Sequence, residues 1–281
     1  MQTGTVGRRL ASGLSFLALM AASAVSAADL TPSTVAAFAM YQRVAEADMQ
    51  RDIAVPDRFL RALPADPVKR RAAREQLQRG EVVVERLTAF DGGRRIEIPD
   101  GLGHHWIGVV FVPGVAVDTA VTLMQAYDHH AEYFRPNVVR SRTLDRDGDR
   151  LSLYLRFYFK KVISVTVNTE SVAEFTRHAP GRVSSAIRST RIAEVKDADT
   201  PRERELPVGH DGGFLWRLNS YWRFLEQDGG TYVECESLTL TRGIPQGFGW
   251  LIGPFVTSVP RETVALTLAA TRRSLLAAGP R

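Results

Sequence analysis

Six strand-like segments that follow one another without an intervening helix constrain the fold of this chain most strongly. Asp147-Gly148 and Asp228-Gly229 each join two of these segments. Asp-Gly favours the two-residue type I′ hairpin turn, because such turns need positive φ at their central residues. Successive hairpins predict an antiparallel sheet. The segments cover residues 137–145, 150–160, 162–177, 182–195, 214–226 and 231–242.

Further elements surround this run of strands. Two short strands at 81–89 and 94–98 flank the hairpin signal Asp91-Gly92-Gly93, and 105–112 is a dense apolar strand. Residues 117–127 have the apolar period of a helix. The chain ends in a long helix over 259–278, with Ser258 as its cap and Pro260 in its first turn. The pattern predicts an α+β fold.

The stretch before residue 80 has a different, helical character. Thr31-Pro32 opens a first helix whose apolar residues, among them Val35 and Phe38, repeat at helical spacing. Asp66-Pro67 opens a second helix, which Gly80 ends and whose body is strongly basic. A solvated helix face is the favoured interpretation of this basic body, and contact with anionic lipid is the alternative. We expect an N-terminal helical extension over 28–80 and a second domain over 81–281.

The first 27 residues have the features of a secretory signal peptide. Arg8 and Arg9 precede a short apolar core at 14–25, and Val25-Ser26-Ala27 supplies small residues for the peptidase. The core is shorter than the roughly 20 residues that span a bilayer. We expect cleavage after Ala27 or Ala28 and a periplasmic or secreted protein.

Charge and cysteine content limit the function classes. Without the signal peptide the chain has 34 Lys and Arg residues and 31 Asp and Glu residues, a net charge of +3. This charge is too small and too dispersed to indicate nucleic-acid binding, which needs a concentrated basic surface. The single cysteine, Cys235, suits an exported fold without internal disulfides, and its place in a strand predicts a small buried residue.

Short motifs in the second part of the chain combine aromatic residues with Gly, Pro and Asn. They are 103–108 (GHHWIG), 127–130 (YDHH), 133–138 (YFRPNV), Ser141, 212–223 (GGFLWRLNSYWR), 234–238 (ECESL), 242–245 (RGIP), 253–254 (GP) and 260–262 (PRE). This set, over roughly residues 81–281, resembles START-like secreted bacterial proteins of the SRPBCC superfamily. The resemblance implies a helix-grip fold, in which a curved antiparallel sheet wraps around a long C-terminal helix. It implies no single function, since this fold hosts both carriers and enzymes.

The strands around Asp228-Gly229 offer two different faces to a cavity between sheet and helix. Residues whose numbers sum to 457 lie opposite each other, so Arg223 pairs with Glu234 and Trp222 with Cys235. In one assignment the aromatic face points inward and the charged face lies in water. In the other the charged face orients a ligand in the cavity, as the START-like resemblance implies. The aromatic face holds Trp216, Leu218, Trp222, Phe224, Val233 and Cys235; the charged face holds Arg217, Asn219, Tyr221, Arg223, Glu234 and Glu236.

The hairpin around Asp147-Gly148 leaves the same question open. Leucines and phenylalanines at odd positions from 151 to 159 share one face, and polar residues share the other. The candidates for the cavity are therefore polar residues of one hairpin together with aromatic and charged residues of the next. They are Tyr154, Arg156, Tyr158, Trp216, Tyr221, Trp222, Arg223, Glu234 and Glu236.

No motif indicates a metal, a cofactor or a catalytic group. His104 and His105 point to opposite faces of a strand, and His129 has no histidine or carboxylate three or four residues later. The chain has no Gly-x-Ser-x-Gly elbow, P-loop or dinucleotide fingerprint. We therefore expect no metal site, no cofactor and no local catalytic motif.

Residues 243–259 are unusually apolar for a Gly/Pro-rich connection. Phe248, Trp250 and Leu251 lie in this segment. A loop buried beneath the N-terminal helices is the favoured interpretation. The alternative is a lid over the cavity that contacts a membrane during lipid exchange.

These observations favour an exported protein that binds, and carries, a lipid or other apolar small molecule beneath its C-terminal helix. An enzyme of cyclase or hydrolase type that uses the same cavity is the alternative. A structural or partner-binding module with a filled core is the third interpretation.

Overall fold

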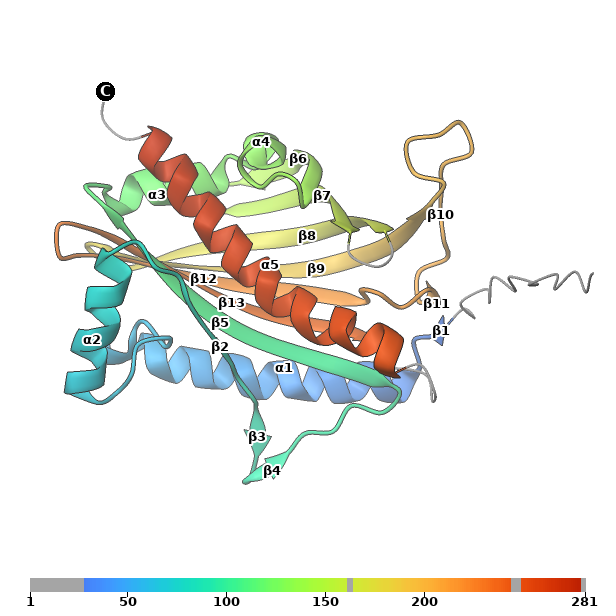
Figure 1. Ribbon diagram of the computed structural model, residues 1–281, viewed down its shortest axis with the longest axis horizontal. Helices are drawn as coiled ribbons and strands as arrows, with labels where there is room; N and C mark the ends of the chain where they lie inside the picture. The colour runs from blue at the N-terminus through green and yellow to red at the C-terminus, as the bar shows by residue number, and fades with distance from the viewer. Residues whose placement is uncertain (1–27, 161–163, 244–248, 279–281) are drawn as a thin grey trace, which may run out of the picture.

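The computed structural model describes residues 28–160, 164–243 and 249–278, with the backbone alone at 28 and 249–257. An eight-stranded antiparallel path forms the main sheet, which curves around the long helix α5 (Gly249–Ala278) (Figure 1). This is the predicted α+β helix-grip arrangement. The strands, in their order across the sheet, are β2 (Val83–Arg86), β5 (Gly101–Pro113), β13 (Gly230–Arg242), β12 (Arg217–Gln227), β9 (Arg182–Lys196), β8 (Ser164–Ala179), β7 (Arg150–Lys160) and β6 (Val138–Asp147).

Local turn chemistry sets the register of this sheet. Asp228 and Gly229 have φ values of 57° and 77° and join β12 to β13. Their positive φ values are those that a type I′ hairpin needs. Arg223 consequently lies opposite Glu234, and Trp222 opposite Cys235, as the sequence predicts.

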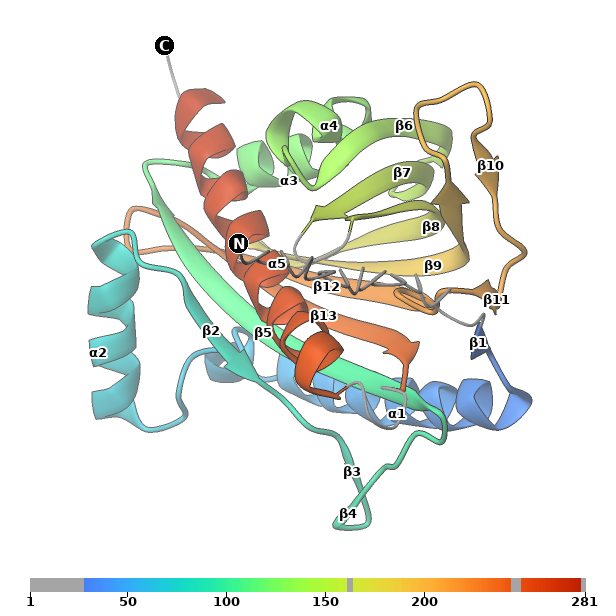
Figure 2. The ribbon, with the colours of Figure 1, turned by 45° about the vertical axis from the view of Figure 1, so that its right-hand side comes forward.

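One face of the sheet, here the inner face, packs against α5 and α3 (Val117–Gln125). Leu268 and Leu275 of α5 are fully buried in a cluster with Val110 and Phe224 of the sheet. Figure 2 shows α5 crossing this face diagonally. The apolar alternation of β5, β12 and β13 therefore directs one set of side chains towards α5.

The start of α5 corrects the sequence prediction. The helix begins at Gly249 rather than Val259, so Ser258 is not its cap and Pro260 lies inside it. Gly and Pro are typical of loops, which is why 243–259 was assigned to a connection. The φ of proline fits a helix, but inside α5 Pro254 and Pro260 each lack an amide donor, and a proline ring inside a helix crowds the carbonyl group four residues earlier. Phe248 lies outside the described residues, and Trp250 and Leu251 lie in the first turn of the helix rather than in a loop.

The N-terminal helices cover the opposite, outer face of the sheet. Thr31 caps α1 (Pro32–Ile53) through the Thr34 amide at 3.2 Å, and Asp66 caps α2 (Pro67–Gln78), both as predicted. Figure 1 shows α1 lying along the sheet opposite α5. The buried residues of α1 recur every three or four positions and pack against Tyr221, Leu238 and Leu240. They are Phe38, Tyr41, Ala45 and Met49.

The short elements include one further correction. The strands in the regions expected at 81–89 and 94–98 are shorter than predicted: β2, and a hairpin of two strands with two residues each. The exposed hairpin, which carries Phe90, projects away from the sheet (Figure 1). The remaining short elements are β1 (Ala28–Asp29), which pairs with β11 (His210–Asp211), β3 (Phe90–Asp91), which pairs with β4 (Arg94–Arg95), β10 (Arg204–Glu205), which pairs with β9, η1 (Pro56–Arg58), η2 (Tyr127–His129) and α4 (His130–Tyr133).

Candidate functional site

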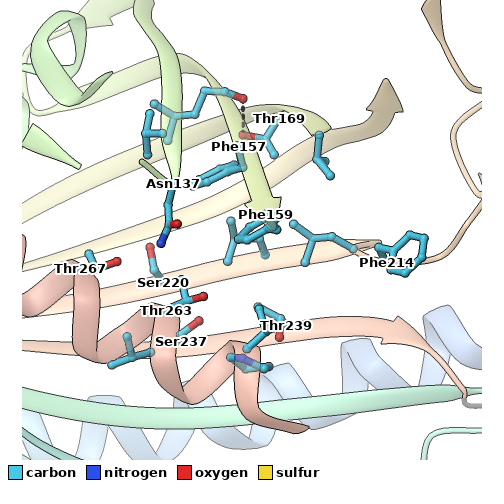
Figure 3. A pocket seen from close by; sticks show the side chains of 18 of the residues that line it. Asn137, Phe157, Phe159, Thr169, Phe214, Ser220, Ser237, Thr239, Thr263 and Thr267 are labelled. Atoms are coloured by element: carbon cyan, nitrogen blue, oxygen red, sulfur yellow. Dashed lines mark hydrogen bonds between the residues drawn. The ribbon is translucent and has the colours of Figure 1, made fainter. Parts of the chain in front are cut away.

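A cavity of about 310 Å³ lies between the inner face of the sheet and α5 (Figure 3). The inner-face residues of β7, β8, β12 and β13, the connection at 213–215 and one side of α5 form its walls. Most of the lining is apolar or aromatic. The apolar lining includes Met124, Phe134, Val138, Leu155, Phe157, Phe159, Val165, Val167, Ile187, Leu215, Leu218, Trp222 and Val264.

The strand alternation explains which side chains reach the cavity. Phe157 and Phe159 lie two residues apart on β7 and therefore point to the same face. Their rings stack with centroids 5.8 Å apart and an angle of 9° between the planes. The wall that β7 contributes is consequently a continuous aromatic surface.

Neutral polar side chains interrupt this apolar lining in one region. Ser220 of β12 lies opposite Ser237 of β13, on the same face as Trp222 and Cys235. Thr263 and Thr267 of α5 line the other wall, one helical turn apart. Figure 3 shows Thr263, Ser220 and Ser237 close together in the cavity, with Asn137 nearby.

Two ionisable residues of basic type, His130 and Arg242, are among the described lining residues, and no Asp or Glu is. His130 is buried, its Nε2 lies 3.0 Å from the Met124 carbonyl oxygen, and burial lowers its pKa to about 4. It is therefore neutral at physiological pH. Cys235 also lines the cavity, and burial raises the pKa of its thiol far above the ordinary value, so it stays protonated. This lining offers shape and apolar surface more than acid–base chemistry.

The charged face of β12 and β13 lies neither in water nor in the cavity. Arg223, Glu234 and Glu236 are each at most 2% exposed, and they point to the outer face beneath the N-terminal extension. Arg223 Nη1 lies 2.6 Å from Glu234 Oε1, and the Ala62 amide donates to Glu234 Oε2 at 2.8 Å. Both predictions for the charged face, exposure to water and orientation into the cavity, are wrong. Neither prediction considered that the N-terminal extension packs over this face.

Glu236 is the centre of this buried network. Arg61 Nη1 donates to both of its carboxylate oxygens at 2.7 and 2.9 Å, and His105 Nε2 lies 2.6 Å from Oε1. Burial alone would raise the pKa of Glu236. The hydrogen bond from His105 and the charges of Arg61 and Arg223 outweigh burial and lower that pKa. Glu236 is therefore a stable buried carboxylate.

Tyr41 connects this network to α1. Its hydroxyl lies 3.1 Å from His105 Nδ1 and accepts the Ala89 amide at 2.9 Å. When His105 Nε2–H donates to Glu236, the Tyr41 hydroxyl can donate to Nδ1. Each polar atom in this chain of contacts then has a partner, which satisfies the requirement for buried polar groups.

The predicted cavity residues of β7 also lie on the outer face. Arg156 is 3% exposed and forms a two-pronged pair with Glu203 at 2.7 and 3.1 Å. Its Nε and the Tyr154 hydroxyl both donate to Asn168 Oδ1 at 2.8 Å. Tyr158 donates to Ser164 at 3.1 Å. The neighbours Leu155, Phe157 and Phe159, rather than these polar residues, line the cavity.

The predicted aromatic residues divide between the two faces. Trp222 lines the cavity, and its Nε1 is buried without a hydrogen-bond partner in the described structure. Trp216 instead packs with α1 and donates to Asp211 at 3.1 Å, and Tyr221 donates to Glu46 of α1 at 2.6 Å. Of the nine predicted cavity residues, all of which are described, Trp222 alone lines the cavity.

Sequence reasoning missed the cavity hydroxyls, although a signal for four of them was present. The rule that opposed residues sum to 457 pairs Ser220 with Ser237 and places both on the Trp222 face. Thr263 and Thr267 carried the spacing of one helix face.

The structure describes neither a metal cluster nor a membrane-spanning helix. Within 28–160, 164–243 and 249–278, no three side chains of His, Cys, Asp or Glu form a group that could hold a metal ion. No helix in these ranges has an apolar stretch long enough to cross a bilayer.

Solved structures with a similar arrangement include proteins of several functions. A STAR-related lipid transfer protein from Xanthomonas axonopodis is 18% identical, with a TM-score of 0.43, over 68% of this chain and 98% of that one. The Zhui aromatase/cyclase from Streptomyces sp. R1128 is 14% identical, with a TM-score of 0.43, over 64% and 100%. Human STARD10 is 10% identical, with a TM-score of 0.44, over 74% and 80%. No family model and no curated protein matches the sequence.

Replacement of Arg223 by Met tests the buried network. Glu234 would keep its buried position but lose its counter-charge, so we expect the free energy of unfolding to fall by about 3–5 kcal/mol. Urea denaturation measures this change. Arg150→Met is the matched control, because Arg150 and its partner Glu174 are about half exposed, and its loss should stay below about 1 kcal/mol. Equal losses in the two variants would contradict the assignment.

His130 gives stability a predictable pH dependence. Its pKa is about 4 in the folded chain and 6.5 in its ordinary state, so the unfolded chain binds the proton more tightly. Stability is complete above pH 6.5 and falls as the pH drops towards 4. We expect this residue alone to make the free energy of unfolding about 2 kcal/mol lower at pH 5 than at pH 8.

His130→Gln isolates that contribution. Glutamine keeps an amide donor for the Met124 carbonyl and does not titrate. Urea denaturation at pH 8, 6.5 and 5 should show a smaller loss in the variant than in the native chain. His104 adds a loss of its own in both proteins, since burial also lowers its pKa to about 4. Parallel pH profiles would refute the role given to His130.

Proposed function

We propose that this protein binds an apolar small molecule, such as a lipid or a polyketide-like compound, in the cavity beneath α5 and carries it. The observation that supports this proposal most directly is the cavity itself. About 310 Å³ stays unfilled between a packed sheet and its crossing helix. Protein interiors otherwise pack densely with few voids larger than a water molecule, so a space of this size needs an occupant.

The lining supplies the driving force for such binding. Aromatic and aliphatic side chains from β7, β8, β12 and α5 form most of the walls. Each Å² of apolar surface that a ligand removes from water contributes about 25 cal/mol. A molecule that is mostly hydrocarbon therefore gains free energy on entry without a strong polar contact.

The same lining gives less support to the enzyme alternative. A cyclase or hydrolase works through acid and base groups that reach its substrate. Among the described lining residues His130 is neutral and engaged with Met124, and the Cys235 thiol is protonated. We therefore favour a carrier over an enzyme for this cavity.

In this proposal, the ligand enters and leaves at the end of the cavity near the start of α5. Gly213, Phe214 and Arg242 line the cavity there, together with Val259 and Pro260 of α5. The first turn of α5 carries Trp250 and Leu251. Transient contact of that turn with a membrane is a part of the proposal that rests on the sequence.

Export is the remaining part of the proposal. The features of residues 1–27 support a cleaved signal. N-terminal sequencing of protein from a periplasmic extract tests export. A first residue at 28 or 29 would support it, and recovery of the intact N-terminus in the cytoplasm would contradict it.

A cavity-filling substitution tests the binding site. Ser220→Phe places a ring in the empty space beside Trp222, and we expect affinity for an apolar probe such as a fluorescent fatty alcohol to fall by at least about tenfold. Fluorescence titration measures the affinity, and circular dichroism with thermal melting confirms the fold. Thr190→Phe, at an exposed position of β9, is the control and should bind normally. Unchanged binding in a folded Ser220→Phe protein would place the ligand elsewhere.

A further inference from the structure

Five hydroxyl groups from β12, β13 and α5 form a polar band inside the mostly apolar cavity, here called the hydroxyl belt. Ser220 comes from β12, Ser237 and Thr239 from β13, and Thr263 and Thr267 from α5. The belt therefore has members on both walls. Figure 3 shows the serines of the sheet close to Thr263 of the helix.

Thr239 of the belt is buried, and the other four members are half-buried. Several other hydroxyl groups in the structure donate to the protein itself. Thr169 donates to the Leu155 carbonyl, Thr231 to that of Val115 and Thr271 to that of Thr267. Among the described residues, the belt hydroxyls form no side-chain hydrogen bond. All five belt residues line the cavity. Because these residues line the cavity, their hydroxyl groups can bond there with water or with an atom of a ligand.

The chemistry of the belt fits a neutral oxygen rather than a charge. A hydroxyl group donates and accepts, so it can meet an alcohol or a carbonyl equally well. A carboxylate or ammonium group placed there would lose its water without gaining a counter-charge, which is strongly unfavourable. His130 is neutral, and Arg242 lies three residues beyond Thr239 and five beyond Ser237, roughly 10 and 17 Å along the strand.

The volume further restricts the ligand. At about 310 Å³ the cavity is at the lower end of the roughly 300–1,000 Å³ that small-molecule sites occupy. One hydrocarbon chain or one fused-ring system matches this volume better than a lipid with two long chains.

We propose that the hydroxyl belt selects uncharged apolar ligands that carry a hydroxyl or carbonyl oxygen, and discriminates against fatty-acid anions of equal length. The ligand oxygen sits between Ser220 and Ser237 of the sheet and Thr263 and Thr267 of α5. This selectivity rests on the proposed function, because it requires that the cavity binds a ligand at all.

The test compares three probes with the same chain length. Tetradecanol, tetradecanoate and tetradecane are delivered from cyclodextrin at pH 8 to the chain that begins at residue 28, and binding is followed by competition with a fluorescent fatty alcohol. We expect tetradecanol to bind at least about tenfold more tightly than either other probe. Equal or tighter binding of tetradecanoate would overturn the selectivity while the carrier function stands. Binding of none of the three would overturn the carrier function itself.

A variant without the four belt hydroxyls that surround the proposed position of the ligand oxygen locates the selectivity. In Ser220→Ala/Ser237→Ala/Thr263→Val/Thr267→Val, the advantage of tetradecanol over tetradecane should fall below about threefold, with tetradecane still bound. Thr166→Val on β8, outside the cavity lining, is the matched control and should keep the full advantage. If the fourfold variant does not fold, Thr263→Val/Thr267→Val serves alone. An undiminished preference in a folded belt variant would refute the proposal.

Discussion

The rest of the structure depends on the buried carboxylate of Glu236. A charge without exposure to water must be paired, and its partners come from three separate parts of the chain. Arg223 belongs to β12, His105 to β5 and Arg61 to the segment that follows α1. The network therefore fixes the N-terminal extension against the outer face and joins β5, β12 and β13. It makes the extension part of the same core as the sheet.

This outer cover determines what the inner face can do. Arg223, Glu234 and Glu236 of β12 and β13 point to the outer face beneath the N-terminal extension. The alternate residues of the same strands therefore face α5. Those residues are small or apolar, as Ser220, Trp222, Cys235 and Ser237 illustrate. A helix that crosses a curved sheet over small side chains leaves space beneath it. The cavity thus follows from strand alternation, and Ser220 and Ser237 are the polar groups in the middle of β12 and β13 that face it, because the charged residues there point the other way.

Much of the fold could be predicted from the sequence, and most of the site could not. Asp228-Gly229 determined a hairpin register that the structure reproduces, and the caps Thr31 and Asp66 began both N-terminal helices. Strand alternation shows which residues share a face of the sheet. It does not show which helix or segment packs against that face. The sequence therefore predicts water or the cavity around Arg223, whereas its partners Glu234 and Glu236 also bind the remote residues Ala62 and Arg61. Long-range packing of this kind has no local signal.

Native mass spectrometry of the protein purified from a periplasmic extract, followed by solvent extraction, tests the central claim most directly. The account predicts a bound mass that is released as an uncharged apolar compound with at least one oxygen. A protein that is recovered without ligand, and that takes up no lipid from vesicles, would contradict it. In that case the cavity would have no carrier role, and an interaction module would be the better interpretation.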